Sequence, residues 1–368
     1  MSSTAISLED CLREMVAIPS VNPNLKPEAS PGGEASVCQY LSGVLRDNGF
    51  EPQMSTVSPD RPNLYCHWDE GKPETIILTA HTDTVPADDW EEDPFRPELR
   101  PDSVWGRGSC DTKASLTVFL AAFIQAARSG NCPYNLIFAA VCDEEAGFTG
   151  SLAAARTLSA DLAIVGEPTC QRVIFKHKGA MRFRLIAAGR SCHSSTPQLG
   201  ENAIYALSQA VLNIRELATR WEQTHDPHLG ARTLSVTTIS GGQAVNVIPD
   251  RAIADVDIRL IPGDNPQKIS VELQQALVPG VTLDGPYLMA NPLSTDPSHP
   301  LASRLAAISG QPFAVAAYAT DAASYSEAGI PAVVFGPGDI RLAHTNHEHI
   351  QTKDLYEALG ILMQCLTG

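Results

Sequence analysis

Thr75-Ile76-Ile77-Leu78-Thr79-Ala80-His81-Thr82-Asp83 is an apolar run that ends in a histidine and an acid. Such a short run, next to helical patterns, is typical of a buried strand in a largely parallel sheet. The same arrangement recurs where apolar runs end shortly before Glu144, Glu145, Glu167 and His344. Because ligands in open α/β sheets bind beyond the carboxyl ends of the strands, we expect these side chains to meet at one sheet edge.

The residue types at these strand ends indicate a metal site. Imidazole and carboxylate without thiolate suit zinc, manganese or cobalt. Asp83 could be a simple helix cap, but it is also placed to hold the second ring nitrogen of His81. The acids 143–145 could be a solvated charge run, and Asp111 could cap the helix that follows it. Crowding three carboxylates at one strand end costs repulsion that a cation would relieve, so the sequence predicts a metallohydrolase.

Hydrophobic periodicity predicts two kinds of domain. Strands and helices alternate up to about Lys176, beginning with a helix that Ser7 can cap. From about 181 the strands alternate apolar and polar residues, and the order β-α-β-β-α-β follows, which is the ferredoxin-like split unit. Strand–helix alternation resumes in 312–335, before a last helix at 352–366.

The fold class we expect is α/β: a mixed, mostly parallel sheet sandwiched by helices, with an inserted α+β ferredoxin-like domain. The predicted boundaries are 1–176 and 291–368 for the two parts of a catalytic metal-binding domain, and 177–290 for the insert. An insert of this size is large enough to be a domain. The length of 368 residues also favours two domains over one core.

Composition disfavours some partners. The formal net charge of −16 disfavours nucleic acid and anionic membranes, and 43% hydrophobic residues are enough for a packed core. The nine cysteines contain no C-x-x-C pair, which favours reduced thiols over a disulfide framework. With neither a signal-peptide pattern nor an apolar run long enough to span a bilayer, the expected location is the cytoplasm.

Motifs along nearly the whole chain carry a resemblance. They are His81-Thr82-Asp83-Thr84-Val85-Pro86, Asp93-Pro94-Phe95 after Trp90, Gly106-Arg107-Gly108 through Asp111, Asp143-Glu144-Glu145, Gly166-Glu167-Pro168-Thr169, His177-Lys178-Gly179, His193-Ser194-Ser195 with Pro197, Asn246-Val247-Ile248-Pro249, Asp257-Ile258-Arg259, Gly336-Pro337-Gly338, and His344 with Glu348. In this order they make the chain resemble the di-zinc aminoacylase/carboxypeptidase-type amidohydrolases. The resemblance is greatest to the group of acetylornithine deacetylase and succinyl-diaminopimelate desuccinylase.

The resemblance implies two divalent metal ions, zinc with cobalt or manganese as possible substitutes. His81 and Glu167 would bind one ion, Glu145 and His344 would bind the other, and Asp111 would bridge both. A bridging carboxylate suits this task because it can keep two cations ~3.5–4 Å apart around one water.

The resemblance also implies catalytic and substrate-binding residues. Glu144 would be the general base, and Asp83 would orient the first histidine ligand. The inserted domain would serve as a lid and dimerisation domain, so that the protein would be a homodimer. From it His193, which in some members of the family reaches across the dimer, would help to stabilise the tetrahedral oxyanion. Asn246 and Arg259 would hold the substrate α-carboxylate.

Two features depart from the family pattern. Thr112 and Ala114 follow Asp111 where relatives usually have methionine and glycine, so the pocket beside the metals could differ in shape. His347 and His349 make the segment after the last ligand rich in histidine, but one histidine already fills that position. Cys110 and Cys192 flank predicted site positions, and we interpret both as small buried hydrophobes.

The expected activity is hydrolysis of the amide bond of a small-molecule N-acyl amino acid, with N-acetylornithine deacetylation, a reaction of arginine biosynthesis, as the leading specific hypothesis. Alternatives within the class are succinyl-diaminopimelate desuccinylase, acetylcitrulline or acetyllysine deacylase, and dipeptidase. A catalytically silent metal- or ligand-binding relative is the alternative from another class, which the intact base and ligand positions disfavour. A structural α/β module would bind no zinc.

Overall fold

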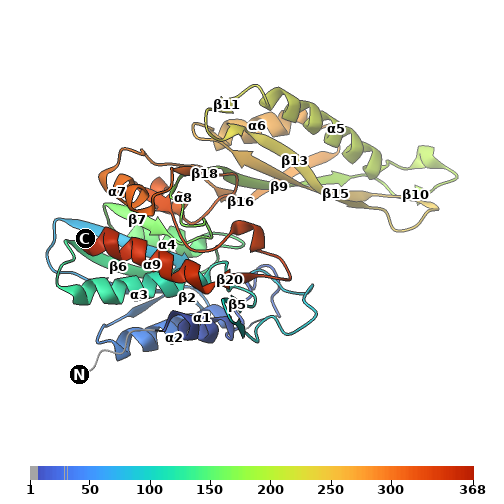
Figure 1. Ribbon diagram of the computed structural model, residues 1–368. Coiled ribbons are helices and arrows are strands. Elements are labelled where there is room, and N and C mark those ends of the chain that lie inside the picture. The colour runs from blue at the N-terminus through green and yellow to red at the C-terminus, as the bar shows by residue number, and fades with distance from the viewer. Residues whose placement is uncertain (1–6, 29, 31) are drawn as a thin grey trace. The chain divides into compact units, whose positions relative to one another are not determined.

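The computed structural model describes residues 7–28, 30 and 32–368. The chain divides into two compact units (Figure 1). Unit 1 consists of Met1–Lys176, Ser294–Ala314 and Thr320–Gly368, and unit 2 of His177–Leu293 and Val315–Ala319. Unit 2 thus includes a short second segment, Val315–Ala319, that lies outside the predicted insert of 177–290.

The sheet that supports unit 1 has nine strands within the described residues, in the order β1-β2-β6-β3-β7-β19-β8-β17, with β18 beside β8. The strands are β1 (Gln53–Ser58), β2 (Arg61–Trp68), β3 (Glu74–His81), β6 (Tyr134–Val141), β7 (Leu162–Val165), β8 (Ile174–His177), β17 (Leu293–Ser294), β18 (Ala314–Ala316) and β19 (Ala332–Val334). The central neighbours β6, β3, β7 and β19 are parallel, whereas β2 and β8 flank them antiparallel. The predicted mixed, mostly parallel sheet is confirmed at its centre.

Helices cover both faces of this sheet (Figure 1). The helices of unit 1 are α1 (Leu8–Val16), α2 (Gly33–Asp47), α3 (Lys113–Ser129), α4 (Thr149–Thr157), α7 (Pro300–Ser309), α8 (Ala322–Glu327) and α9 (Thr352–Thr367), with the short 3-10 turn η2 (Ile340–Leu342). Ile76, Leu78 and Ala80 of β3 share one apolar core with α1, α2, α3, α7 and α9. On the other face, α4 and α8 contact each other and the strands β6, β7 and β19.

Local sequence explains where these helices begin and end. The Ser7 hydroxyl caps α1 by accepting a hydrogen bond of 3.2 Å from the Asp10 N–H. Helix α3 ends at Gly130, whose φ of 73° is the left-handed conformation that glycine adopts without steric cost. Because α3 is buried nearly all round, its first residues are held rigidly against the sheet. A small sheet of β4 (Glu98–Arg100), β5 (Ser103–Trp105) and β20 (His349–Gln351) completes unit 1.

Unit 2 is a four-stranded antiparallel sheet in the order β13-β15-β9-β16, with two helices packed on it. Its main elements, in chain order, are β9 (Gly179–Ala188), α5 (Ala203–Trp221), β13 (Thr233–Gly241), β15 (Arg251–Leu260), α6 (Pro266–Ala276) and β16 (Val281–Ala290). This succession is the β-α-β-β-α-β unit predicted from the sequence.

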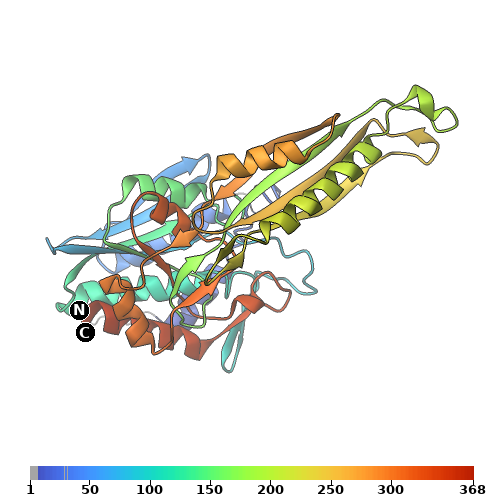
Figure 2. The ribbon, with the colours of Figure 1, turned by 90° about the horizontal axis from the view of Figure 1, so that it is seen from above.

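The remaining elements of unit 2 are short. They are β10 (Cys192–His193), β11 (His225–Asp226), β12 (Gly230–Ala231), β14 (Val247–Ile248) and the 3-10 turn η1 (Pro197–Leu199). Strands β10 and β14 pair with each other beyond the end of the four-stranded sheet, as Figure 2 shows from above. Among the helices of the described residues, none combines the length and the apolar character needed to cross a membrane.

Candidate metal centre

Three neighbouring parallel strands of unit 1 end within two residues of one another. His81, the last residue of β3, lies opposite Val141, the last residue of β6, and Thr79 of β3 lies opposite Val165, the last residue of β7. The acids that follow β6 and β7 are therefore brought beside the histidine that ends β3. This is the sheet edge at which the sequence analysis expected the site.

Asp111 lies between two histidines. Its Oδ1 is 3.1 Å from Nε2 of His81, and its Oδ2 is 3.2 Å from Nε2 of His344. Asp111 is 6% exposed and stands at the start of buried helix α3, so its carboxylate is held in place. One carboxylate therefore faces a different imidazole with each of its oxygens.

Two glutamates complete the groups around these histidines. Oε2 of Glu145 is 3.1 Å from Nε2 of His344, and Oε1 of Glu167 is 3.9 Å from Nε2 of His81. Glu144 also belongs to the cluster, because its carboxylate lies within 4.8 Å of ligand atoms of His81 and Glu167. The five predicted ligands and the predicted base are thus brought together in unit 1.

The cluster carries more negative charge than its histidines can balance. Burial alone would raise the pKa of Asp111, but hydrogen bonds with His344 and His81 outweigh it and hold that pKa below its usual value. Contact with Asp111 raises the pKa of His344 to about 11. Burial and the neighbouring charge of Glu167 raise the pKa of Glu144 well above its ordinary range. Crowded carboxylates of this kind are relieved by bound cations.

The donor types fit divalent cations. They are imidazole nitrogens and carboxylate oxygens, the set that zinc, cobalt and manganese accept. Two groups of described residues could each hold a metal ion: His81 with Asp111 and Glu145, and His81 with Glu144 and Glu167. The two groups share His81, and Asp111 of the first group also contacts His344.

Asp83 supports the cluster from behind. The Nδ1 atom of His81 lies 3.0 Å from the main-chain oxygen of Asp83 and 3.4 Å from its Oδ1. The same carboxylate accepts the backbone N–H groups of Glu144 and Glu145, at 3.1 and 3.0 Å. Asp83 is fully buried, so it can fix both the ring and the turn after β6.

Glu348 supports Asp111 in a way that the sequence did not reveal. Its Oε1 accepts the backbone N–H groups of Cys110 and Asp111, both at 2.9 Å, and its Oε2 pairs with the Arg107 guanidinium at 2.6 Å. Both members of this ion pair are buried. The motifs contained Glu348 and Arg107, but the 241 positions between them left no local signal of their contact.

Thr112, which departs from the family pattern, binds the main chain beside a predicted ligand. Its buried hydroxyl donates a hydrogen bond of 3.1 Å to the carbonyl oxygen of Gly166, the residue before Glu167. The threonine therefore ties the start of α3 to the end of β7.

The predicted residues of unit 2 lie in two places. Exposed His193 ends β10, and the carbonyl oxygen of exposed Asn246 accepts the backbone N–H of Ser194 at 3.0 Å. Arg259 is near the end of β15, where its Nε donates to Asp257 Oδ1 at 2.8 Å. This pairing within the strand is the alternative to a substrate-binding role for Arg259.

Asn246 and Arg259 are far apart within one copy of unit 2. Asn246 precedes the first residue of β15, Arg251, and Arg259 lies eight residues further along that extended strand. At ~3.3 Å per residue, these eight residues alone span roughly 26 Å. The side chains of Asn246 and Arg259 in one copy therefore do not reach the same carboxylate, because the strand is longer than the reach of either side chain. Their role in binding the substrate carboxylate stays a prediction.

The additional histidines lie outside the cluster. The ring of His349 stacks on Trp105 at 4.2 Å between centroids, and Nδ1 of His347 lies 3.1 Å from the side-chain oxygen of Asn346. Neither belongs to a group of described residues that could hold a metal ion. Of the flanking thiols, Cys110 is buried as expected, whereas Cys192 is only half-buried.

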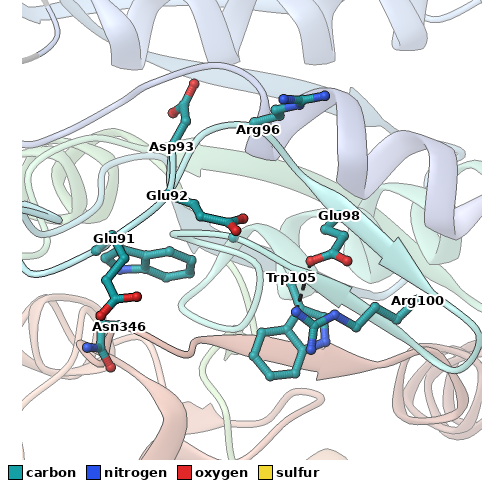
Figure 3. A pocket seen from close by; sticks show the side chains of 10 residues that line it. Glu91, Glu92, Asp93, Arg96, Glu98, Arg100, Trp105 and Asn346 are labelled. Carbon is teal, nitrogen blue, oxygen red and sulfur yellow. Dashed lines mark hydrogen bonds and ion pairs between the residues drawn. The ribbon is translucent and has the colours of Figure 1, made fainter.

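A separate cavity of about 460 Å³ lies in unit 1 and contains none of the predicted ligands. Its lining consists of Trp90, Glu91, Glu92, Asp93, Arg96, Glu98, Arg100, Trp105, Gly106 and Asn346. Figure 3 shows Arg100 next to the ring of Trp105 and paired with Glu98, at 2.9 Å. These groups satisfy one another on the surface.

Comparison with known proteins gives consistent matches. The family model described as "Peptidase family M20/M25/M40" matches residues 77–368. A peptidase M20 domain-containing protein of Schizosaccharomyces pombe is 30% identical over 90% of this chain and 80% of its own length. Acetylornithine deacetylase of Klebsiella pneumoniae is 31% identical over 96% of this chain and 95% of its own length.

The fold also matches solved structures. The M20 family metallo-carboxypeptidase Sso-CP2 from Sulfolobus solfataricus superimposes with a TM-score of 0.82, covering 98% of this chain and 99% of that chain. Its sequence identity of 18% makes this a likeness of fold.

Proposed function

The chain belongs to the peptidase family M20/M25/M40, and we propose that it uses two divalent metal ions to hydrolyse the amide bond of an N-acyl amino acid. The observation that carries the proposal is the position of Asp111, whose two oxygens lie 3.1 and 3.2 Å from two different histidines. A single structural ion would need only one oxygen of Asp111. Two ions can share the Asp111 carboxylate, with one ion at each oxygen.

Each neighbouring residue has a distinct task in this proposal. The ions would lower the pKa of a water molecule and polarise the amide carbonyl when they are bound. Glu144 takes a proton from the attacking water at its carboxylate and passes it to the leaving nitrogen. Asp83 keeps the ring of His81 oriented through Nδ1. His193 donates to the oxyanion of the tetrahedral intermediate.

Exposure supports an approach of the substrate from one side. The His81 side chain is 1% exposed, whereas the His344 side chain is 53% exposed. The donors around His81 are therefore buried. The scissile amide would reach the centre from the side of His344.

Unit 2 would act as the lid and dimerisation domain. Arg259 can hold the substrate α-carboxylate with two parallel hydrogen bonds, after that carboxylate displaces Asp257. Since Asn246 and His193 lie roughly 26 Å or more from Arg259 along the sheet, one copy cannot place all three around one substrate. We therefore propose a homodimer in which the β10–β14 end of one copy completes the site of the other.

N-acetylornithine is the substrate that we propose first, in the cytoplasm and within arginine biosynthesis. The likeness to acetylornithine deacetylases over nearly the whole chain supports it. Succinyl-diaminopimelate, acetylcitrulline, acetyllysine and dipeptides are the alternatives.

The test is a panel of acetyl-amino acids, succinyl-amino acids and dipeptides, assayed with zinc, cobalt or manganese and again after chelation. We expect metal-dependent release of the free amino acid, fastest from N-acetylornithine. Faster turnover of another member would change the substrate. Two bound ions without turnover of any member would favour the catalytically silent relative, and a protein that binds no zinc would refute the proposal.

A further inference from the structure

A buried asparagine outside the ligand set joins two strand ends of the centre. The Nδ2 atom of Asn22 donates to Asp83 Oδ2 at 2.7 Å and to Asp143 Oδ1 at 3.0 Å. Its Oδ1 accepts the backbone N–H of Asn24 at 2.9 Å, and its own backbone N–H donates to the carbonyl oxygen of Thr84 at 2.9 Å. Asn22 is fully buried. Both amide hydrogens and the oxygen are in use, so the side chain is fixed in one orientation.

The first acceptor of Asn22 holds three groups of the centre. The Asp83 carboxylate accepts the backbone N–H groups of Glu144 and Glu145 and lies 3.4 Å from Nδ1 of His81. A displacement of Asp83 would therefore move one ligand of each metal position and the general base together.

The second acceptor holds the turn after β6. Asp143 adopts a φ of 69°, which is uncommon for a residue other than glycine. Its carboxylate accepts from Arg61 at 2.9 Å, from Asn24 at 3.0 Å and from Thr149 at 2.7 Å, and its backbone N–H donates to Glu34 at 2.9 Å. These contacts keep the turn in place, and the turn positions the two glutamates that follow it.

We propose that Asn22 is a positioning residue for the metal centre. By donating to Asp83 and Asp143, it fixes the end of β3 relative to the end of β6, and thereby sets His81 against Glu144 and Glu145. This inference rests on the proposed function. An amide is suited to the position because it supplies two hydrogens without adding charge, whereas an acid would place a third carboxylate between the two.

The test compares Asn22→Ala with the matched control Asn24→Ala. Both variants remove a side-chain donor to Asp143, but only Asn22→Ala also removes the donor to Asp83. Zinc affinity is measured by competition with a chelator, and the cobalt-loaded proteins are compared by their visible absorption spectra. We expect Asn22→Ala to bind zinc about 10–100-fold more weakly, as changes behind a ligating histidine do, and to shift the cobalt spectrum. Asn24→Ala should match the unaltered protein in both.

Thermal unfolding, followed by circular dichroism, distinguishes a local change at the metal centre from a general loss of stability. If Asn22→Ala does not fold, Asn22→Ser replaces it in the test. Serine keeps one hydrogen-bond donor, so we expect the same loss of zinc affinity and the same spectral shift, both smaller than for alanine. Zinc affinity and cobalt spectra that are equal for Asn22 and Asn24 variants would overturn the inference while leaving the proposed function intact. An unaltered protein that binds no zinc would instead remove the proposed function, and this inference with it.

Discussion

Replacing Glu144 with glutamine tests whether Glu144 is the general base or a metal ligand. The carboxylate of Glu144 lies within 4.8 Å of ligand atoms of His81 and Glu167, so distance alone would permit it to be a ligand. Glu145, in contrast, lies 3.1 Å from His344, whose opposite contact is Asp111 at 3.2 Å. We assign Glu145 to the metal and Glu144 to the water, since adjacent residues of a turn can face different groups.

The size of the effect follows from the task of the base. Glutamine keeps the shape of Glu144 but cannot accept the proton, so turnover should fall by ~10²–10⁴-fold. At ~1.36 kcal/mol per factor of ten, this loss corresponds to ~2.7–5.4 kcal/mol of transition-state stabilisation. KM should change little, because the metals and the proposed carboxylate clamp remain. The measurement is steady-state kinetics on the best substrate of the panel.

Metal content provides the check on this assignment. Glu144→Gln should keep two ions per chain by elemental analysis, whereas the matched variant Glu145→Gln should lose the ion beside His344. The reasoning is refuted if Glu144→Gln loses an ion while Glu145→Gln keeps both, because the two glutamates would then have exchanged roles.

Four other predictions follow from the contacts. Asp111→Ala should lose both ions and His81→Ala first only one, by elemental analysis; unchanged metal content in Asp111→Ala would contradict the bridge. Arg107→Met should lower the free energy of unfolding of the metal-free protein in urea by ~3–5 kcal/mol, because the buried carboxylate of Glu348 is left without its ion-pair partner. A loss under about 1 kcal/mol would mean that the ion pair contributes little net stability. Thr112→Val should cost ~1–3 kcal/mol in the same assay, since a buried carbonyl loses its donor, and no loss would mean that another group replaces it. Arg259→Ala should lower kcat/KM strongly for acyl-amino acids but barely for the corresponding amides, which lack the α-carboxylate. Equal losses on both would contradict the proposal that Arg259 binds this carboxylate.

The centre of the fold was predictable because its strands are short and buried on both faces. The run that ends at His81 alternates between the two helical layers, with Ile76 and Leu78 in the core of α3 and α9. Strands β1 and β2 were not predicted. β2 carries Pro62, Asn63 and His67 among its apolar residues, so neither periodicity stands out, and its place beside β6 is set by long-range pairing.

The ligands could be found from the sequence, but their supports could not. Every ligand follows an apolar run or precedes a helix, so local pattern locates it. Asn22, in contrast, contacts Asp83 and Asp143 across 61 and 121 positions. A single asparagine before a proline is typical of a turn. Only the folded chain brings that turn beneath two strand ends, so no spacing rule could have predicted the contact.

Sequence proximity was misleading for Asn246 and Arg259. Most of the residues between them belong to β15. Because an extended strand advances ~3.3 Å per residue, two positions that are close in sequence lie far apart in space. Each end of unit 2 therefore carries only part of the proposed substrate site, with His193 and Asn246 at one end and Arg259 at the other. A carboxylate clamp and an oxyanion donor can act on one substrate only if the two ends come from different copies, which makes the proposed homodimer a requirement of the proposed chemistry.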